Sequence, residues 1–104
     1  MIVAVDLDGT LSKYPRQLKT LIECLVQCGQ EVFMLTACAG ELPEEERPAE
    51  ARRRVRAYGV TIPVIWCHTH EKPEVCRQRS VDLLIDDVPF DNLPFGTAQL
   101  IPKN

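Results

Sequence analysis

Short apolar runs alternate along this chain with stretches whose apolar residues recur at helical spacing. Runs rich in Val, Ile and Leu that are too short for a core helix are typical of strands buried on both faces of a parallel sheet. Such strands are predicted at residues 1–5 and 31–37, within residues 60–67, and at residues 81–85, and residues 99–101 could add a fifth. Because helices separate these strands, the pattern predicts βαβ units, and therefore a parallel sheet with right-handed crossovers and helices on both faces.

Three helices are predicted between the strands. The first runs from Pro15, which can open a helix in its first turn, to Gln27, and Gly29 ends it. The second runs from residue 44 or 49 to residue 58, and the third covers about residues 74–78. The apolar positions of the first helix, spaced three and four apart, are Leu18, Leu21, Ile22, Leu25 and Val26.

The second helix has an uneven charge distribution. Acidic residues come first, at positions 44–46, and its basic residues, which come later, are Arg52, Arg53, Arg54 and Arg56. This order complements the helix dipole. We therefore interpret these charges as a solvated helix face rather than a binding patch.

Chemically capable side chains follow each predicted strand. They are Asp6 and Asp8, then Thr36, then Cys67 and His68, and finally Asp86 and Asp87. In parallel α/β sheets, ligands bind at the carboxyl ends of the strands, near the point where the strand order reverses. Asp6 and Asp8 should point the same way in extended backbone, and two close carboxylates repel unless a positive charge lies between them. Mg²⁺, a hard cation with oxygen ligands, is the expected partner.

Composition narrows the class of protein. A chain of 104 residues predicts one domain, residues 1–104, with one core. Hydrophobic content of 45% and charged content of 26% are ordinary for a globular protein, and a net charge of −3 gives no electrostatic reason to expect nucleic acid or an anionic membrane. No stretch approaches the ~20 apolar residues of a membrane span, and Asp6 interrupts the first run too early for a signal peptide. A cytoplasmic location is expected.

The five cysteines are an odd number, and we interpret them as reduced thiols, mostly buried. Cys24 and Cys28 lie on one face of the first predicted helix, but a lone C-x₃-C pair is not a zinc signature. Cys67, His68 and His70 form an equally poor zinc pattern; either the histidines line the cleft or they are ordinary loop residues. Phe33 and Trp66 are interpreted as core.

The polar residues suit transfer of a phosphoryl group to water, which needs a nucleophile, a proton carrier and positive charge. Asp6 is the candidate nucleophile, because a carboxylate can form an acyl phosphate. Asp8 could protonate the leaving oxygen and then activate water. Asp86 and Asp87 would join Asp6 around Mg²⁺.

Two further residues would complete such a site. Thr36 offers a hydroxyl at the neighbouring strand end, and Lys72 offers a cation from the loop before the third helix. Each has a simpler interpretation. Thr36 favours strands in any case, and Lys72 could be an exposed loop lysine.

These motifs resemble those of the haloacid dehalogenase-like (HAD) superfamily. The similar segments, in the same order, are DLDGT at residues 6–10, FMLTA ending a strand with Thr36, HEKPE with Lys72, and LLIDD with Asp86 and Asp87. The resemblance implies a three-layer Rossmann-like parallel sheet and a Mg²⁺-dependent phosphatase that acts through an aspartyl-phosphate on Asp6. It also implies that the backbone carbonyl of Asp8 ligates Mg²⁺ and that backbone N–H groups near Leu7, Asp8 and Ala37 hold the phosphate.

The sequence departs from that family pattern in some respects. Ile85 stands where many relatives have Gly, and Asp91 is either the later acid of the extended motif or a loop residue. Asp at position 8 resembles the phosphatases rather than the dehalogenases. The gaps at residues 12–15 and 68–71 are too short for a cap domain, so the site is expected to be open unless another subunit or the loop at residues 38–48 covers it.

Three functions are therefore expected, in order. The first is a capless HAD-like phosphatase acting on a phosphorylated substrate whose identity the sequence does not show. The second is a non-catalytic HAD-like binding or regulatory module that keeps the metal pocket. The third is a nucleic-acid end-processing phosphatase, against which the acidic charge balance counts.

Overall fold

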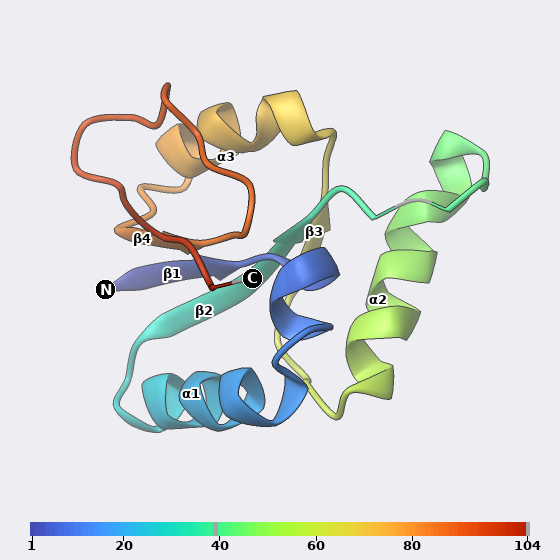
Figure 1. Ribbon diagram of the computed structural model, residues 1–104, viewed down its shortest axis with the longest axis horizontal. Helices are drawn as coiled ribbons and strands as arrows, with labels where there is room; N and C mark the ends of the chain where they lie inside the picture. Colours follow the sequence, from blue (N-terminus) through green and yellow to red (C-terminus); the bar gives the residue numbers. More distant parts are fainter. Residues whose placement is uncertain (39, 104) are drawn as a thin grey trace.

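Five strands form a single parallel sheet in the computed structural model, which describes residues 1–38 and 40–103 (Figure 1). The strands are β1 (Ile2–Val5), β2 (Glu31–Thr36), β3 (Val64–Trp66), β4 (Leu83–Ile85) and β5 (Ala98–Leu100). Their order in the sheet is β3-β2-β1-β4-β5. The chain builds outward from β1 through β2 to β3, then returns to the other side of β1, so the order reverses between β1 and β4.

Helices cover both faces of this sheet (Figure 1). They are α1 (Pro15–Gln27), α2 (Arg47–Ala57) and α3 (Lys72–Gln78). Helices α1 and α2 pack on one face and α3 packs on the other. The predicted three-layer Rossmann-like parallel sheet is confirmed, and the described part of the chain contains no cap domain.

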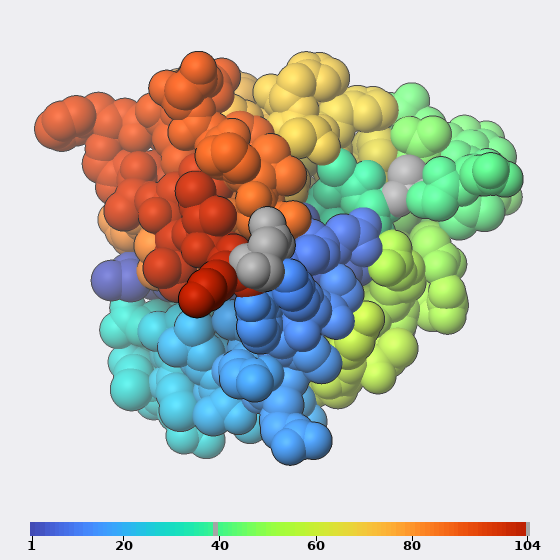
Figure 2. All heavy atoms as spheres, viewed as in Figure 1, coloured from blue at the N-terminus to red at the C-terminus, as the bar shows by residue number. Residues whose placement is uncertain are grey.

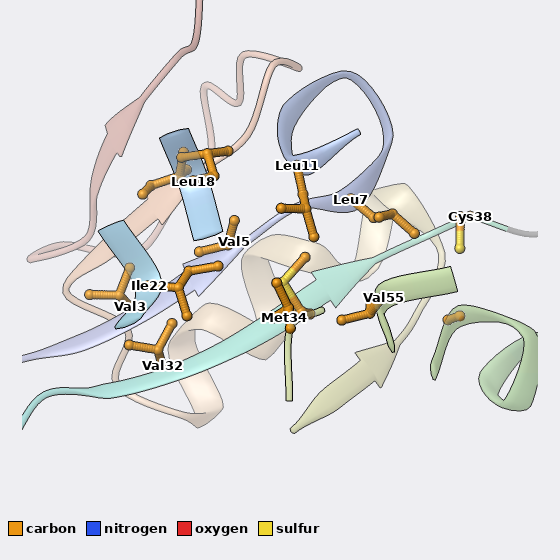
Figure 3. Packing of buried hydrophobic residues seen from close by; sticks show 13 residues of the cluster. Val3, Val5, Leu7, Leu11, Leu18, Ile22, Val32, Met34, Cys38 and Val55 are labelled. Carbon is orange, nitrogen blue, oxygen red and sulfur yellow. The ribbon is translucent and has the colours of Figure 1, made fainter. Parts of the chain in front are cut away.

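The core has two parts because the central strands are buried on both faces. Val3 and Val5 of β1 face α1 and α2 (Figure 3). Ala4 between them belongs to the cluster on the α3 side. Strand β2 alternates in the same way, with Val32 and Met34 on the first face. This double burial explains why these strands are continuous apolar runs rather than alternating ones. The main partners from the helices are Leu18, Ile22, Ala51 and Val55 on one face and Cys76 on the other.

The register brings the ends of β1 and β4 level with each other. Val5 pairs with Ile85, and the backbone N–H of Asp6 donates to the carbonyl of Ile85 at 2.9 Å. The next residue after each strand is an aspartate, Asp6 or Asp86. The two carboxylates therefore come together at the point where the strand order reverses, where such sheets bind ligands.

Strand β3 lies within the predicted range of residues 60–67 and starts just after Pro63, whose carbonyl accepts the N–H of Met34 at 2.8 Å. Two other predicted starts are wrong. Strand β4 begins at Leu83 rather than Val81. Helix α3 begins at Lys72 rather than Glu74, because residues Thr69–Glu71 form a 3₁₀ turn that leads into it. Glu71 closes this turn by accepting the N–H of His68 at 2.9 Å.

The segment after β4 returns across the α3 side of the sheet before β5. Phe90 and Leu93 from this segment pack on the core beneath α3. Figure 2 shows the last coloured residues, in red, lying against the blue segment that follows β1. The Tyr14 hydroxyl donates to the carbonyl of Lys103 at this contact. Among the described residues, no helix combines the length and the apolar character needed to cross a bilayer.

Candidate functional site

Three carboxylates converge at the carboxyl ends of β1 and β4. Asp6 follows β1, and Asp86 and Asp87 follow β4. One oxygen from each of these side chains lies within 4.8 Å of the others. Asp6 and Asp86 are buried and Asp87 is half-buried. Buried carboxylates are stable only when a cation or hydrogen-bond donors compensate them.

Lys72 supplies part of that compensation. Its Nζ donates to Asp6 Oδ1 at 2.9 Å and to Asp86 Oδ2 at 2.6 Å, and its side chain is 3% exposed. It reaches the carboxylates because α3 starts at the same edge of the sheet. The interpretation of Lys72 as an exposed loop residue is therefore wrong.

The ion pair with Lys72 does not fully offset the effect of burial on the pKa of Asp6. Burial is the largest influence and raises the pKa of Asp6 to about 7; Lys72 opposes this shift and the charge of Asp86 adds to it. For Lys72, burial alone would lower the pKa, but the two carboxylates outweigh it and the pKa is raised. The group consequently holds a firmly charged cation and a carboxylate that is costly to ionise.

The two carboxylates after β4 are held differently: Asp86 by the local backbone, and Asp87 by the Thr10 hydroxyl, which donates to its Oδ1 at 3.5 Å. Asp86 Oδ1 accepts the N–H of Val88 at 2.9 Å, which fixes the carboxylate that Lys72 also binds. Asp87 lies over Gly9, so closely that a Cβ at Gly9 would collide with its carboxylate. Gly9 also has a φ of +75°, a conformation that favours glycine. The glycine therefore permits both the turn after β1 and the approach of Asp87.

Asp8 lies outside this group of three carboxylates. The chain turns after Asp6, because Leu7–Leu11 forms a kinked turn in which Asp8 and Gly9 have non-helical backbone angles. The carboxylate of Asp8, 54% exposed, instead pairs with Arg54, whose Nη2 lies 2.8 Å from Asp8 Oδ1. The structure therefore does not favour metal ligation by the Asp8 side chain together with the other three carboxylates. A role for the Asp8 backbone carbonyl stays a prediction.

Thr36 is buried at the end of β2, and its Oγ1 accepts the N–H of Cys38 at 3.0 Å. The hydroxyl oxygen thus holds the chain as it leaves the sheet. Ala37 and Cys38, rather than Thr36, line the pocket beside Asp6. A role for Thr36 as a donor to a ligand stays a prediction.

The carboxylates open onto a pocket of about 310 Å³. Its walls come from the ends of β1, β2 and β4 and from the start of α3, with Asp6, Asp8, Lys72 and Asp87 among them. A second hollow, of about 230 Å³, lies between α1 and the segment after α2, but it is lined mainly by apolar atoms. Of these two hollows, the first combines converging polar groups with the strand ends.

The remaining candidates lie beside the pocket. His68 Nε2 is 2.9 Å from Glu44 Oε1, and the rings of His68 and His70 stack at 5.6 Å. Burial raises the pKa of the Cys67 thiol to about 11. Within residues 1–38 and 40–103, neither Cys67 nor the two histidines belong to a metal-binding group of three side chains. Asp91 is exposed on the following loop and also lies outside the group.

Sequence reasoning missed Arg54, which was assigned to a solvated helix face. It lies three residues after the buried Ala51 and next to the buried Val55, at the border of the face that α2 packs on the sheet. Its position in the helix could have predicted a contact with the sheet. An arginine at the edge of a packed helix face can reach the end of the sheet, whereas Arg52 and Arg56 of the same helix are exposed.

Fold and site together define a parallel α/β protein with an acidic pocket where the strand order reverses. Among solved structures, the chain is similar to a crystal structure of a universal stress protein in complex with cAMP, with a TM-score of 0.52 and 18% sequence identity. The match covers 97% of this chain and 96% of that one. No protein-family model matches the chain, and a search of curated proteins found no match.

These comparisons overturn the predicted membership of the HAD superfamily. A structural neighbour is a universal stress protein, and no family model supports the resemblance. The predicted phosphatase activity, with its aspartyl-phosphate on Asp6 and its two HAD-based alternatives, is corrected with it. The physical reason is that many unrelated α/β proteins place polar residues at the ends of parallel strands, so these motifs predicted the fold correctly without establishing a family or a reaction.

Proposed function

We propose that this chain binds Mg²⁺ through Asp6, Asp86 and Asp87 and, together with the cation, binds a phosphate-bearing small molecule without transforming it. The observation that carries the proposal is the convergence of three carboxylate oxygens within 4.8 Å at the carboxyl ends of two adjacent parallel strands.

The charge balance of the pocket supports a divalent cation. Four carboxylates (Asp6, Asp8, Asp86 and Asp87) face two basic side chains, Lys72 and Arg54. With all four carboxylates ionised, two negative charges are left over, and one divalent cation would balance them. The raised pKa of Asp6 is consistent with this view, because burial is not fully compensated by Lys72.

The donor set suits Mg²⁺. Oxygen ligands are the ones this cation prefers, and it usually binds through one or two carboxylates while keeping water or phosphate oxygens in its other positions. Asp87 is half-buried and Lys72 does not bind it, so its oxygens are accessible from the pocket. The cation would supply a positive charge that attracts a phosphate to an otherwise acidic pocket.

The class of ligand follows from the place of the site and from the structural comparison. Parallel sheets bind ligands beyond the carboxyl ends of their strands, where the strand order reverses, and the pocket of about 310 Å³ lies there. The similar universal stress protein was crystallised with cAMP, which carries a phosphate. We therefore include nucleotides among the candidate ligands.

A cytoplasmic location fits the five free cysteines. A second subunit over the open pocket stays a prediction.

Calorimetric titration of Mg²⁺ into the wild-type protein and into Asp87→Asn tests the cation site. Asp87 is the best target because it is half-buried and outside the Lys72 ion pair, so its loss should leave the fold intact. Mg²⁺ affinity is expected to fall about tenfold or more, because a charged ligand is lost. Asp91→Asn is the matched control: the same charge is removed from the same loop, outside the group of carboxylates. Equal Mg²⁺ affinity in wild type and Asp87→Asn would disprove the site.

The ligand is tested with two probes, inorganic phosphate and cAMP, each titrated with and without Mg²⁺. Binding that requires Mg²⁺ and weakens in Asp87→Asn is expected for at least one probe. The cAMP recovered afterwards should be unchanged, as judged by chromatography. Failure of both probes to bind, or conversion of the bound compound, would contradict the proposal.

A further inference from the structure

Two basic side chains differ in how firmly they are held: Lys72 lines the pocket, and Arg54 lies outside it but pairs with Asp8 of the pocket wall. Lys72 is 3% exposed and donates to two carboxylates that are themselves buried. Arg54 is 33% exposed and pairs with one carboxylate, that of Asp8, which is 54% exposed. Removing Lys72 from its partners would leave two buried charges uncompensated, whereas Asp8 without Arg54 would simply be hydrated.

Arg54 contacts the edge of the pocket through Asp8. Its guanidinium reaches from α2 to Asp8 in the pocket wall, and it also lines another hollow, of about 330 Å³, beside α2. The neighbouring Arg53 lines the same hollow but is bound by Glu50 on its own helix through two nitrogen atoms. Arg54 is therefore the basic side chain, among the described residues lining these two spaces, whose pairing a ligand could replace at low cost.

We propose that Arg54 is the anion-recognition residue of this site, and that it exchanges the Asp8 carboxylate for the phosphate oxygens of the ligand. This inference rests on the proposed function, since it assigns the contact that distinguishes a phosphate ligand from the cation alone. A guanidinium is suited to the role because its planar set of donors matches two phosphate oxygens at once. Lys72 instead keeps Asp6 and Asp86 in place.

The proposal predicts opposite effects on the two ligands. In Arg54→Gln, the affinity for inorganic phosphate in saturating Mg²⁺ should fall about tenfold or more, because charge-assisted hydrogen bonds to the anion are lost. The affinity for Mg²⁺ alone should stay the same or rise by about twofold to fivefold, because the pocket becomes more negative. Damage to the fold would weaken both.

Arg52→Gln is the matched control, because it removes the same charge from the same helix at an exposed position. Both affinities should stay within about twofold of wild type. Arg54→Lys keeps the charge without the planar donor set, so its phosphate affinity should lie between those of wild type and Arg54→Gln. Both titrations are carried out by calorimetry on the full chain.

The outcomes separate this inference from the proposed function. If wild type binds Mg²⁺ and phosphate but Arg54→Gln binds phosphate equally well, the inference fails and the proposed function stands. A parallel loss of both affinities in Arg54→Gln would assign Arg54 a structural role and also overturn the inference. If wild type binds neither probe, both are wrong.

Discussion

The two ends of α3 carry basic residues with opposite roles. Lys72, the first residue of the helix, is buried and bound to Asp6 and Asp86. Arg77, near its other end, pairs with Glu74 on the same helix, and both side chains are more than half exposed. Water screens the exposed pair, so it contributes little, whereas a buried pair that loses one partner leaves an uncompensated charge. Position relative to the end of the sheet, rather than residue type, therefore decides what a charge does in this protein.

The largest loss of stability is expected when the buried Lys72 side chain loses its charge. Lys72→Met should lower the free energy of unfolding by about 3–5 kcal/mol, because Asp6 and Asp86 lose their shared partner. Arg77→Met, on the same helix, should produce no measurable change. Urea denaturation of the metal-free proteins at pH 8 measures both. Equal losses in the two variants would remove the distinction between the two ends of α3.

The pH dependence of that loss sharpens the comparison. Burial raises the pKa of Asp6 to about 7, above its value in the unfolded chain, so the folded protein binds more protons than the unfolded one between about pH 4 and pH 7. Stability therefore falls as the pH rises through this window. Without Lys72 the raised pKa loses its main opposing influence, so Lys72→Met should be less destabilising at pH 5 than at pH 8. The same loss at both values would mean that Lys72 acts through packing alone.

A smaller loss of stability is expected from substitutions in the turn after β1. Gly9→Ala has to place a Cβ against the Asp87 carboxylate at a φ of +75°, whereas Gly29→Ala has a φ of +82° and nothing within 4 Å. Urea denaturation should show a loss of about 1–2 kcal/mol for Gly29→Ala, from the backbone conformation alone, and a larger loss for Gly9→Ala. Gly9→Ala should also weaken Mg²⁺ binding, because Asp87 is displaced. Equal losses would show that Asp87 moves aside freely.

Much of the fold was predictable because its signals are local. The predicted bounds of α1 match the structure, since Pro15 opens the helix, the apolar spacing continues to its end, and Gly29 follows with a positive φ. The unbroken apolar runs predicted buried parallel strands, and residues directly after parallel strands necessarily meet at one edge of the sheet. The convergence of Asp6 with Asp86 and Asp87 is therefore as predictable as the sheet itself.

The parts of the site that escaped prediction depend on contacts between distant segments. Asp8 was expected to share a ligand with Asp6 by strand geometry, but the backbone turns at Leu7 and the carboxylate pairs with Arg54, forty-six positions away. The burial of Lys72 depends on where α3 starts, and a 3₁₀ turn moved that start. The family resemblance failed for a different reason, since strand-end motifs reflect the sheet that many unrelated sites share.

The smallest perturbation is a thiol label. It tests whether α3 stays packed on the sheet, which the burial of Lys72 requires. Burial raises the pKa of Cys76, on the inner side of α3, to about 11, so the reactive thiolate is scarce at pH 8. Cys24 and Cys28 of the α1 segment are exposed. A disulfide reagent should therefore label Cys24 and Cys28 in the native protein within minutes, and label Cys76 only after denaturation, as read by peptide mass spectrometry. Rapid labelling of Cys76 would mean that α3 detaches readily from the sheet, and Lys72 could not then remain a fixed, buried partner of Asp6 and Asp86.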